Sequence, residues 1–267
     1  MQILDGKLHS QNILVELQKT ITENKLSPIL DIIFVGDNPA SEKYTNMKQT
    51  MGKSIGINGT IHHLEETVEE SEIIAKIDKL NKDPTITAIM VQLPLPDGFD
   101  THKIINTIDP RKDADGLTAI NLGLLFQKDN TALVSATPLG IMTFFEKYNI
   151  DVSGKNAVIL NRSPFIGLSL AALLINADAT VTICHSKTIN TLELCQKADI
   201  IIAGTGKPNY LTPDFVKEGS VIIDVGMEVD FENVKNKCSF ITPPTGGVGP
   251  MTVASLLANT VKIALDK

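Results

Sequence analysis

Short apolar runs, separated by segments that favour helices, recur along this chain and constrain its fold more than any other feature. Runs of this length with little alternation are typical of strands that are buried on both faces. Repeated strand–helix units favour a parallel sheet that is covered by helices on both sides. The sequence therefore predicts an α/β protein. The runs are Ile29–Val35, Ile86–Val91, Ala157–Leu160, Ile200–Ala203 and Val221–Val225.

Length and composition limit the classes of protein to which the chain can belong. A chain of 267 residues, 43% hydrophobic and 21% charged, is long enough for two soluble globular domains. Its net charge of −7, with no Lys/Arg cluster, argues against a nucleic-acid partner. No apolar run approaches the roughly 18 residues of a membrane span. The first residues lack the layout of a signal peptide, so we expect a cytoplasmic protein with no membrane partner.

The cysteines and histidines indicate neither disulfides nor a metal site. Cys184, Cys195 and Cys238 contain no Cys-x-x-Cys pair, a pattern that favours reduced thiols in the core. The five histidines show no His-Glu-x-x-His spacing. We therefore expect no bound metal.

One helix early in the chain carries candidate catalytic residues. We expect it to begin at Ser41, which can cap it, and to present Tyr44 and Lys48 on one face. Gln92 directly follows the apolar run that ends at residue 91. Ligands collect at the carboxyl ends of parallel strands, where Gln92 could hydrogen-bond Lys48. The alternative is an exposed amphipathic helix with an ordinary surface lysine.

The segment 109–116 combines aspartates, a proline and a glycine, and it is expected to form a loop. A carboxylate from Asp113 or Asp115 could bind the polar edge of a ligand. The alternative is ordinary turn chemistry, because aspartate before glycine is common in loops.

The second half of the chain indicates a nucleotide site. Residues 161–167 have the expected strand–loop–helix layout but lack the G-x-G-x-x-G fingerprint. The next apolar run leads into Cys184–Lys187, with no acid to bind a ribose 2′-hydroxyl as in NAD-preferring folds. Arg162 and Ser186, with Lys187 as a further candidate, could instead hold a 2′-phosphate, so NADP is favoured over NAD. The alternative is a solvated polar loop.

Two glycine-rich segments complete the candidate sites. Thr205 and Gly206 lie in a loop after a buried run, where the backbone can approach a flat ligand closely. This loop lacks the Walker spacing, so ATP is not expected. Gly247 and Pro250 precede a terminal helix that is expected from about Thr252, and they form either a simple turn or a wall of a ligand cleft.

Five motifs in the same order resemble one known family. Together they are similar to the bifunctional methylenetetrahydrofolate dehydrogenase/methenyltetrahydrofolate cyclohydrolase (FolD) family, over essentially the whole chain. The motifs are Tyr44-x-x-x-Lys48, Val91-Gln92-Leu-Pro-Leu-Pro96, Lys112-Asp113-Ala-Asp115-Gly116, Cys184-His-Ser-Lys-Thr188 and Gly246-Gly-Val-Gly-Pro-Met-Thr252.

The resemblance implies a homodimer of two-domain chains with a cleft between the domains. Residues 1–135 would form an N-terminal parallel-sheet αβ domain that binds folate, with the C-terminal helix 252–267 packing back on it. Residues 136–251 would form a Rossmann-like domain that binds NADP.

The resemblance also implies roles for single residues. Tyr44 would stack on the folate, and Lys48 would be the catalytic group, assisted by Gln92. Asp115 would hold the pterin ring, and Gly247 and Pro250 would contact the substrate. The implied cofactor contacts are Asn161, Arg162, Ser163, Ser186, Thr205, Gly206 and Met227.

The implied activity is NADP-dependent oxidation of 5,10-methylenetetrahydrofolate, followed by hydration of the methenyl product to 10-formyltetrahydrofolate. The chain departs from the family at Asn161, Ser169 and Thr245, where Gly, Pro and Pro are usual, and the segment after Gly226 is short. The alternatives are a cyclohydrolase with weakened or lost dehydrogenase activity, and a non-catalytic NADP-binding sensor. A short-chain dehydrogenase would carry its glycine-rich strand before, rather than after, the Tyr-Lys pair.

Overall fold

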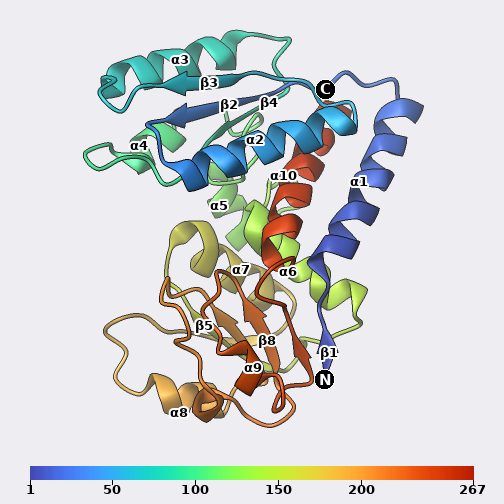
Figure 1. Ribbon diagram of the computed structural model, residues 1–267. Coiled ribbons are helices and arrows are strands. Elements are labelled where there is room, and N and C mark those ends of the chain that lie inside the picture. The colour runs from blue at the N-terminus through green and yellow to red at the C-terminus, as the bar shows by residue number, and fades with distance from the viewer. The chain divides into compact units, whose positions relative to one another are not determined.

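The computed structural model describes every residue from 1 to 267 and divides into two compact units (Figure 1). Each unit contains one parallel sheet, after which we name it. The predicted two-domain α/β fold is confirmed. The three-stranded unit consists of Asn12–Leu124, Thr131–Val134 and Leu256–Lys267. The six-stranded unit consists of Met1–Gln11, Leu125–Asn130 and Ser135–Ser255.

The sheet of the three-stranded unit has the order β3-β2-β4. All residues of β2 and β4 are buried, as expected for strands covered on both faces. The chain runs from β2 to β3 and then back past β2 to β4, so right-handed crossovers place α2 and α3 on opposite faces (Figure 1). The elements are β2 (Leu30–Val35), α2 (Pro39–Ser54), β3 (Ile61–Leu64), α3 (Glu70–Lys82), β4 (Ala88–Val91), α4 (Thr101–Ile105) and α5 (Ala119–Phe126).

The sheet of the six-stranded unit has the order β1-β9-β8-β7-β5-β6. Its strand order reverses next to β5, because β6 lies on one side of β5 and β7 on the other. A crevice at the carboxyl ends of the strands is expected at such a reversal. The strands are β1 (Gln2–Ile3), β5 (Asn156–Leu160), β6 (Thr180–Ile183), β7 (Ile200–Ala203), β8 (Val221–Asp224) and β9 (Phe240–Ile241). The helices within this unit are α6 (Ala136–Lys147), a π-helical turn (Pro164–Leu168), α7 (Ser169–Asn176), α8 (Thr191–Gln196), a 3₁₀ turn (Pro213–Phe215) and α9 (Phe231–Val234).

Three helices contribute residues to both units: α1 (Gly6–Glu23), the end of α5, and α10 (Val248–Leu265). A first domain over residues 1–135 would include the first eleven residues. In the structure these residues instead belong to the six-stranded unit. The reason is that β1 pairs with β9, a strand too short for the sequence pattern to reveal. The helix that was expected from Thr252 begins earlier, at Val248.

The cap of α2 also differs from the expectation. Asn38, and not Ser41, caps the helix: its side-chain oxygen accepts the amide protons of Ala40 and Ser41, both at 3.0 Å. Pro39 occupies the first helical position, where the lack of an N–H costs nothing. The sequence Asn-Pro thus starts the helix two residues before the serine.

The apolar character of α10 was underestimated from the sequence, because Thr252, Ser255 and Asn259 interrupt its apolar runs. By length and composition alone, α10 is long enough and apolar enough to cross a membrane, with a mean hydropathy of 1.3. However, 61% of this segment is buried inside the protein, as in the core helix of a soluble protein.

The three cysteines are free and buried, which confirms the prediction of reduced core thiols.

A buried lysine closes the end of α3. The Nζ of Lys112 donates hydrogen bonds to the carbonyls of Leu80 (2.9 Å), Asn81 (2.8 Å) and Asp83 (2.7 Å). These carbonyls belong to the last helical turn and its C-cap, where the regular intrahelical pattern of hydrogen bonds ends. Lys112 therefore satisfies the end of α3 and fixes the start of the loop that leads to Asp115.

Replacement of Lys112 by Met is expected to lower the free energy of unfolding by about 2–4 kcal/mol, because three carbonyls lose a charged donor. Chemical denaturation measures this change. The matched control is Lys82→Met, an exposed lysine at the end of the same helix, for which a change within about 0.5 kcal/mol is expected. Equal stabilities of the two variants would contradict the assignment.

Candidate active site and cofactor site

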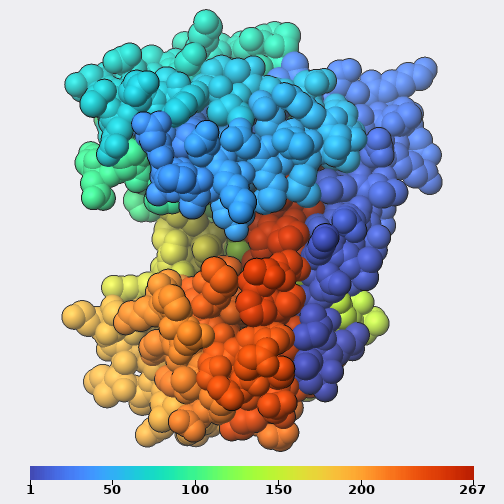
Figure 2. Space-filling model, in the orientation of Figure 1, coloured from blue at the N-terminus to red at the C-terminus, as the bar shows by residue number.

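The candidate catalytic lysine lies at the carboxyl edge of the three-stranded sheet. β2 leads into α2, which carries Lys48, and Gln92 directly follows β4, the neighbour of β2. The two side chains meet there: the Nζ of Lys48 donates a hydrogen bond of 3.0 Å to the Oε1 of Gln92. Both are buried, whereas Tyr44 on the same helix is 47% exposed. Figure 2 shows the surface over α2, in light blue, open to solvent.

The carboxamide of Gln92 is held so that its oxygen faces the lysine. Its Nε2 donates to the carbonyl of Leu93 at 2.5 Å, which leaves the Oε1 directed toward Lys48. The hydroxyl of the buried Thr45 lies 3.3 Å from the same oxygen and donates to the carbonyl of Ser41 at 2.8 Å. Sequence reasoning missed Thr45, although its spacing of three from Lys48 places both on one helix face.

Asp115 lies in a loop whose conformation is held by hydrogen bonds of the neighbouring residues. Asp113 is 1% exposed, and its Oδ2 accepts the amide of Thr118 at 2.8 Å and the side-chain amide of Asn121 at 3.0 Å. The Nδ2 of Asn259, from α10, donates to the carbonyl of Ala114 at 2.8 Å. Asp113 is thus a structural residue, as the turn-chemistry alternative held. The half-buried Asp115 is the acid that acts electrostatically on Lys48.

Burial is the main influence on the charge of Lys48. It lowers the pKa of the Lys48 amine below the ordinary lysine value, because a charged amine loses its hydration in the interior. The nearby carboxylate of Asp115 raises the same pKa, but this effect is smaller. The site therefore holds a lysine that gives up its proton more readily than a surface lysine.

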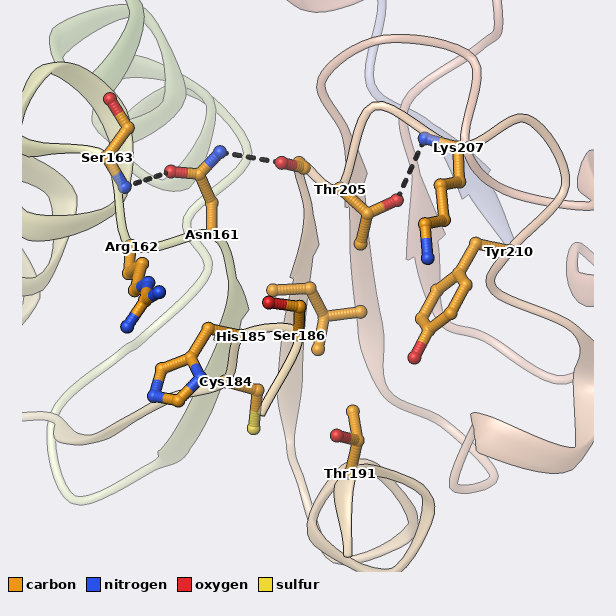
Figure 3. A pocket seen from close by; sticks show the side chains of 12 residues that line it. Asn161, Arg162, Ser163, Cys184, His185, Ser186, Thr191, Thr205, Lys207 and Tyr210 are labelled. Carbon is orange, nitrogen blue, oxygen red and sulfur yellow. Dashed lines mark hydrogen bonds between the residues drawn. The ribbon is translucent and has the colours of Figure 1, made fainter. Parts of the chain in front are cut away.

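A cavity of about 330 Å³ lies at the carboxyl ends of β5, β6 and β7, where the strand order reverses. Five of the seven predicted cofactor residues line it: Asn161, Arg162, Ser163, Ser186 and Thr205. Sequence reasoning missed the other side chains of the lining, which are Leu160, Cys184, His185, Thr191, Lys207 and Tyr210. Figure 3 shows these side chains around the cavity.

The lining of this cavity suits an anionic ligand, because it includes Arg162 and Lys207 but no aspartate or glutamate. The Nζ of Lys207 lies over the ring of Tyr210, 5.9 Å from its centroid. The lack of an acid after β6 agrees with the sequence argument that a 2′-phosphate fits better than a ribose 2′-hydroxyl. Phosphate groups of a dinucleotide thus fit the side chains that are present.

Asn161, where the family usually has glycine, has a defined place in this cavity. Its Nδ2 donates to the carbonyl of Gly204 at 2.6 Å, and its Oδ1 accepts the amide of Ser163 at 2.7 Å (Figure 3). A Cβ on Gly167 would lie 2.0 Å from the carbonyl oxygen of Asn161, so this position requires glycine. The Asn161 side chain therefore links the loop after β5 to the loop after β7.

The other predicted contacts do not line this cavity. The amide of Gly206 donates to Glu228 at 2.7 Å, and Met227 is 59% exposed with φ of 63°. Gly247 packs against Gly6, where a Cβ would lie 1.8 Å from the Gly247 carbonyl oxygen, and Pro250 lies in the first turn of α10. Contacts of Gly247 and Pro250 with a substrate stay predictions.

The six-stranded unit has a doubly wound parallel sheet with a crevice that suits phosphate groups, and the other unit holds a buried lysine. Together these features define the class of protein: an α/β enzyme that uses a dinucleotide. Comparison with known families assigns it further. The catalytic-domain model of tetrahydrofolate dehydrogenase/cyclohydrolase matches residues 4–115, and the NAD(P)-binding-domain model matches residues 135–267. The chain belongs to the tetrahydrofolate dehydrogenase/cyclohydrolase family.

Individual relatives match over nearly their whole length. The bifunctional protein FolD of Nitratiruptor is 47% identical over 280 residues, covering 100% of this chain and 99% of the relative. The crystal structure of FolD from Campylobacter jejuni has a TM-score of 0.97 and 41% identity, covering 100% and 99% of the two chains. A Trypanosoma brucei FolD structure complexed with NADP and an inhibitor has a TM-score of 0.95 and 30% identity, covering 99% and 97%.

The amine of Lys48 is expected to titrate below the ordinary lysine pKa of 10.5, because burial outweighs the influence of Asp115. The ¹³Cε chemical shift of Lys48, followed against pH and assigned with Lys48→Met, measures this. Asp115→Asn is expected to move the midpoint further down, because it removes the negative charge that favours the protonated amine. A midpoint at or above 10.5 in the wild type would contradict the burial argument.

Proposed function

We propose that this chain interconverts 5,10-methylenetetrahydrofolate, 5,10-methenyltetrahydrofolate and 10-formyltetrahydrofolate as a bifunctional dehydrogenase and cyclohydrolase. One observation carries the proposal: Lys48 is buried, its amine is held by Gln92 at 3.0 Å, and Asp115 acts on its charge. Relatives named bifunctional protein FolD support the same reaction pair. The three-stranded unit handles the folate, and the six-stranded unit binds the cofactor.

The hydration step needs a group that can take a proton from water. Water adds to the methenyl carbon and loses one proton to a base. The bond between this carbon and N5 then breaks, N5 takes the remaining hydroxyl proton, and the 10-formyl product forms. A lysine whose pKa burial lowers has a larger neutral fraction to accept that proton. Gln92 orients the amine, Asp115 holds the polar edge of the pterin, and the exposed Tyr44 covers its aromatic face.

The dehydrogenase step needs NADP, which accepts a hydride from the methylene carbon when bound. Arg162 and Ser186 would hold its 2′-phosphate, and Asn161, Ser163 and Thr205 line the same cavity. The side chain of Asn161 is held by its hydrogen bonds with Gly204 and Ser163, and the cavity that it lines stays open beside it. This argues against the alternative in which the departures from the family abolish cofactor binding.

A non-catalytic NADP-binding sensor is disfavoured, because Lys48 and Gln92 are both present and joined by a hydrogen bond.

We further propose that the protein is a cytoplasmic homodimer with no nucleic-acid or membrane partner. Family resemblance supports the dimer, and the net charge of −7 supports the absence of nucleic acid.

Lys48→Met is expected to reduce the rate of methenyltetrahydrofolate hydrolysis by about 10²–10⁴-fold, because it removes the proton-accepting group. The loss of methenyl absorbance with time measures this rate. Lys43→Met, an exposed lysine on the same helix, is the matched control and is expected to hydrolyse the substrate at the wild-type rate. Equal rates for Lys48→Met and Lys43→Met would disprove the assignment.

Arg162→Ala is expected to raise the KM for NADP by about tenfold or more and to change the KM for NAD little, because NAD has no 2′-phosphate. Reduction of each cofactor, followed separately with methylenetetrahydrofolate, measures both constants. Lys197→Ala is the matched control, since Lys197 is an exposed lysine of the same unit that does not line the cavity. If Arg162→Ala raised both constants equally, Arg162 would not recognise the 2′-phosphate.

A further inference from the structure

A buried glutamate lies behind the loop that forms one wall of the cofactor cavity. Glu228 is 3% exposed and is not among the residues that line the cavity. Its Oε2 accepts the amide of Thr205 at 2.6 Å, and its Oε1 accepts the amide of Gly206 at 2.7 Å. Both carboxylate oxygens are thus engaged with consecutive amides of the loop Gly204–Lys207, which we call the clamp loop.

The backbone of Glu228 is itself fixed at the end of β8. The Oδ1 of Asp224 accepts the amide of Glu228 at 2.8 Å, and its Oδ2 accepts the amide of Val229 at 3.2 Å. The carbonyl of Glu228 accepts the amide of Leu211 at 3.0 Å, just beyond the clamp loop. Glu228 therefore contacts the chain on both sides of Lys207 and Tyr210, two residues of the cavity wall.

Asn161 holds the same loop from the opposite end. Its side-chain amide donates to the carbonyl of Gly204, next to the two amides that Glu228 binds. Inside the loop, the amide of Lys207 donates to the hydroxyl of Thr205 at 3.1 Å. Consecutive peptide units of the clamp loop are thus fixed before any ligand enters, which lowers the entropy lost on binding.

We propose that Glu228 is a positioning residue for the cofactor: it holds the clamp loop in the conformation that presents Thr205, Lys207 and Tyr210 to NADP. This inference rests on the proposed function, because it takes NADP as the ligand of the cavity. Glu228 acts through the loop and does not touch the cofactor. Charge-assisted hydrogen bonds to two amides are stronger than those of a neutral acceptor, so a carboxylate suits this position.

Glu228→Gln tests the proposal. The variant keeps one acceptor oxygen but directs an NH₂ group at the second amide, so the dissociation constant of NADPH is expected to rise by about tenfold or more. The chain contains no tryptophan, so binding is followed by the fluorescence of NADPH itself. The KM for NADP should rise in parallel, whereas the KM for methylenetetrahydrofolate should change less than about twofold, because the substituted side chain acts on the cofactor loop alone. Glu218→Gln, an exposed glutamate of the same unit, is the matched control.

A second measurement on the wild type does not depend on the folding of a variant. Without cofactor, the amides of Thr205 and Gly206 are expected to exchange with solvent slowly, at rates like those of β7 residues, because Glu228 accepts both. Fast exchange of both amides, or equal NADPH affinity of Glu228→Gln and wild type, overturns the proposal. Wild-type protein that neither binds NADPH nor reduces NADP would instead disprove the proposed function.

Discussion

In each sheet the strand order reverses beside one strand, which is β2 in the three-stranded unit and β5 in the six-stranded unit. Both the lysine site and the cavity depend on this reversal. β2 lies between β3 and β4, and β5 lies between β6 and β7. Helices that leave neighbouring strands to opposite faces diverge at the carboxyl edge and leave a crevice there. In the three-stranded unit the reversal brings Lys48 and Gln92 together across 44 positions of sequence. In the six-stranded unit it brings together the ends of β5, β6 and β7, which line the proposed cofactor cavity. Parallel pairing alone would not create these sites.

The protein keeps several ionisable groups in its interior, and each has partners suited to its charge. Lys112 donates to three carbonyls, and Asp113 and Asp224 accept backbone amides. Lys48 differs from Lys112 in its acceptors, since three backbone carbonyls accept from Lys112 and the Oε1 of Gln92 accepts from Lys48. Burial is the largest influence on the pKa of both lysines, and it lowers both values, because a charged amine loses hydration in the interior. The amine of Lys112 is fully used in closing α3, whereas Lys48 lies beside Gln92 and Asp115, at the carboxyl edge where a ligand is expected.

The central strands could be predicted well from the sequence, because Leu30–Val35 and Ile200–Ala203 are continuous apolar runs with few other interpretations. β1 and β9 could not, because two-residue strands carry no pattern and depend on a partner far away in the chain. Lys48 and Gln92 could be paired from their positions after strands. Thr45 could be placed on the same helix face as Lys48, but not beside Gln92. The role of Glu228 could not be predicted, because it depends on hydrogen bonds to amides distant in sequence.

Two of the departures from the family pattern, at Asn161 and in the segment after Gly226, involve the same loop. Glycine at position 161 would leave the end of β5 and the Gly204 carbonyl unconnected, whereas Asn161 joins them. In the short segment after Gly226, Glu228 accepts the amide of Gly206 in the loop after β7, while Asp224 accepts the amide of Glu228. A loop held by two side chains has less freedom to lose on binding than one held by backbone alone, and this advantage can compensate for the shorter segment. The changes at Asn161 and after Gly226 therefore support the same loop, and neither implies a weaker cofactor site.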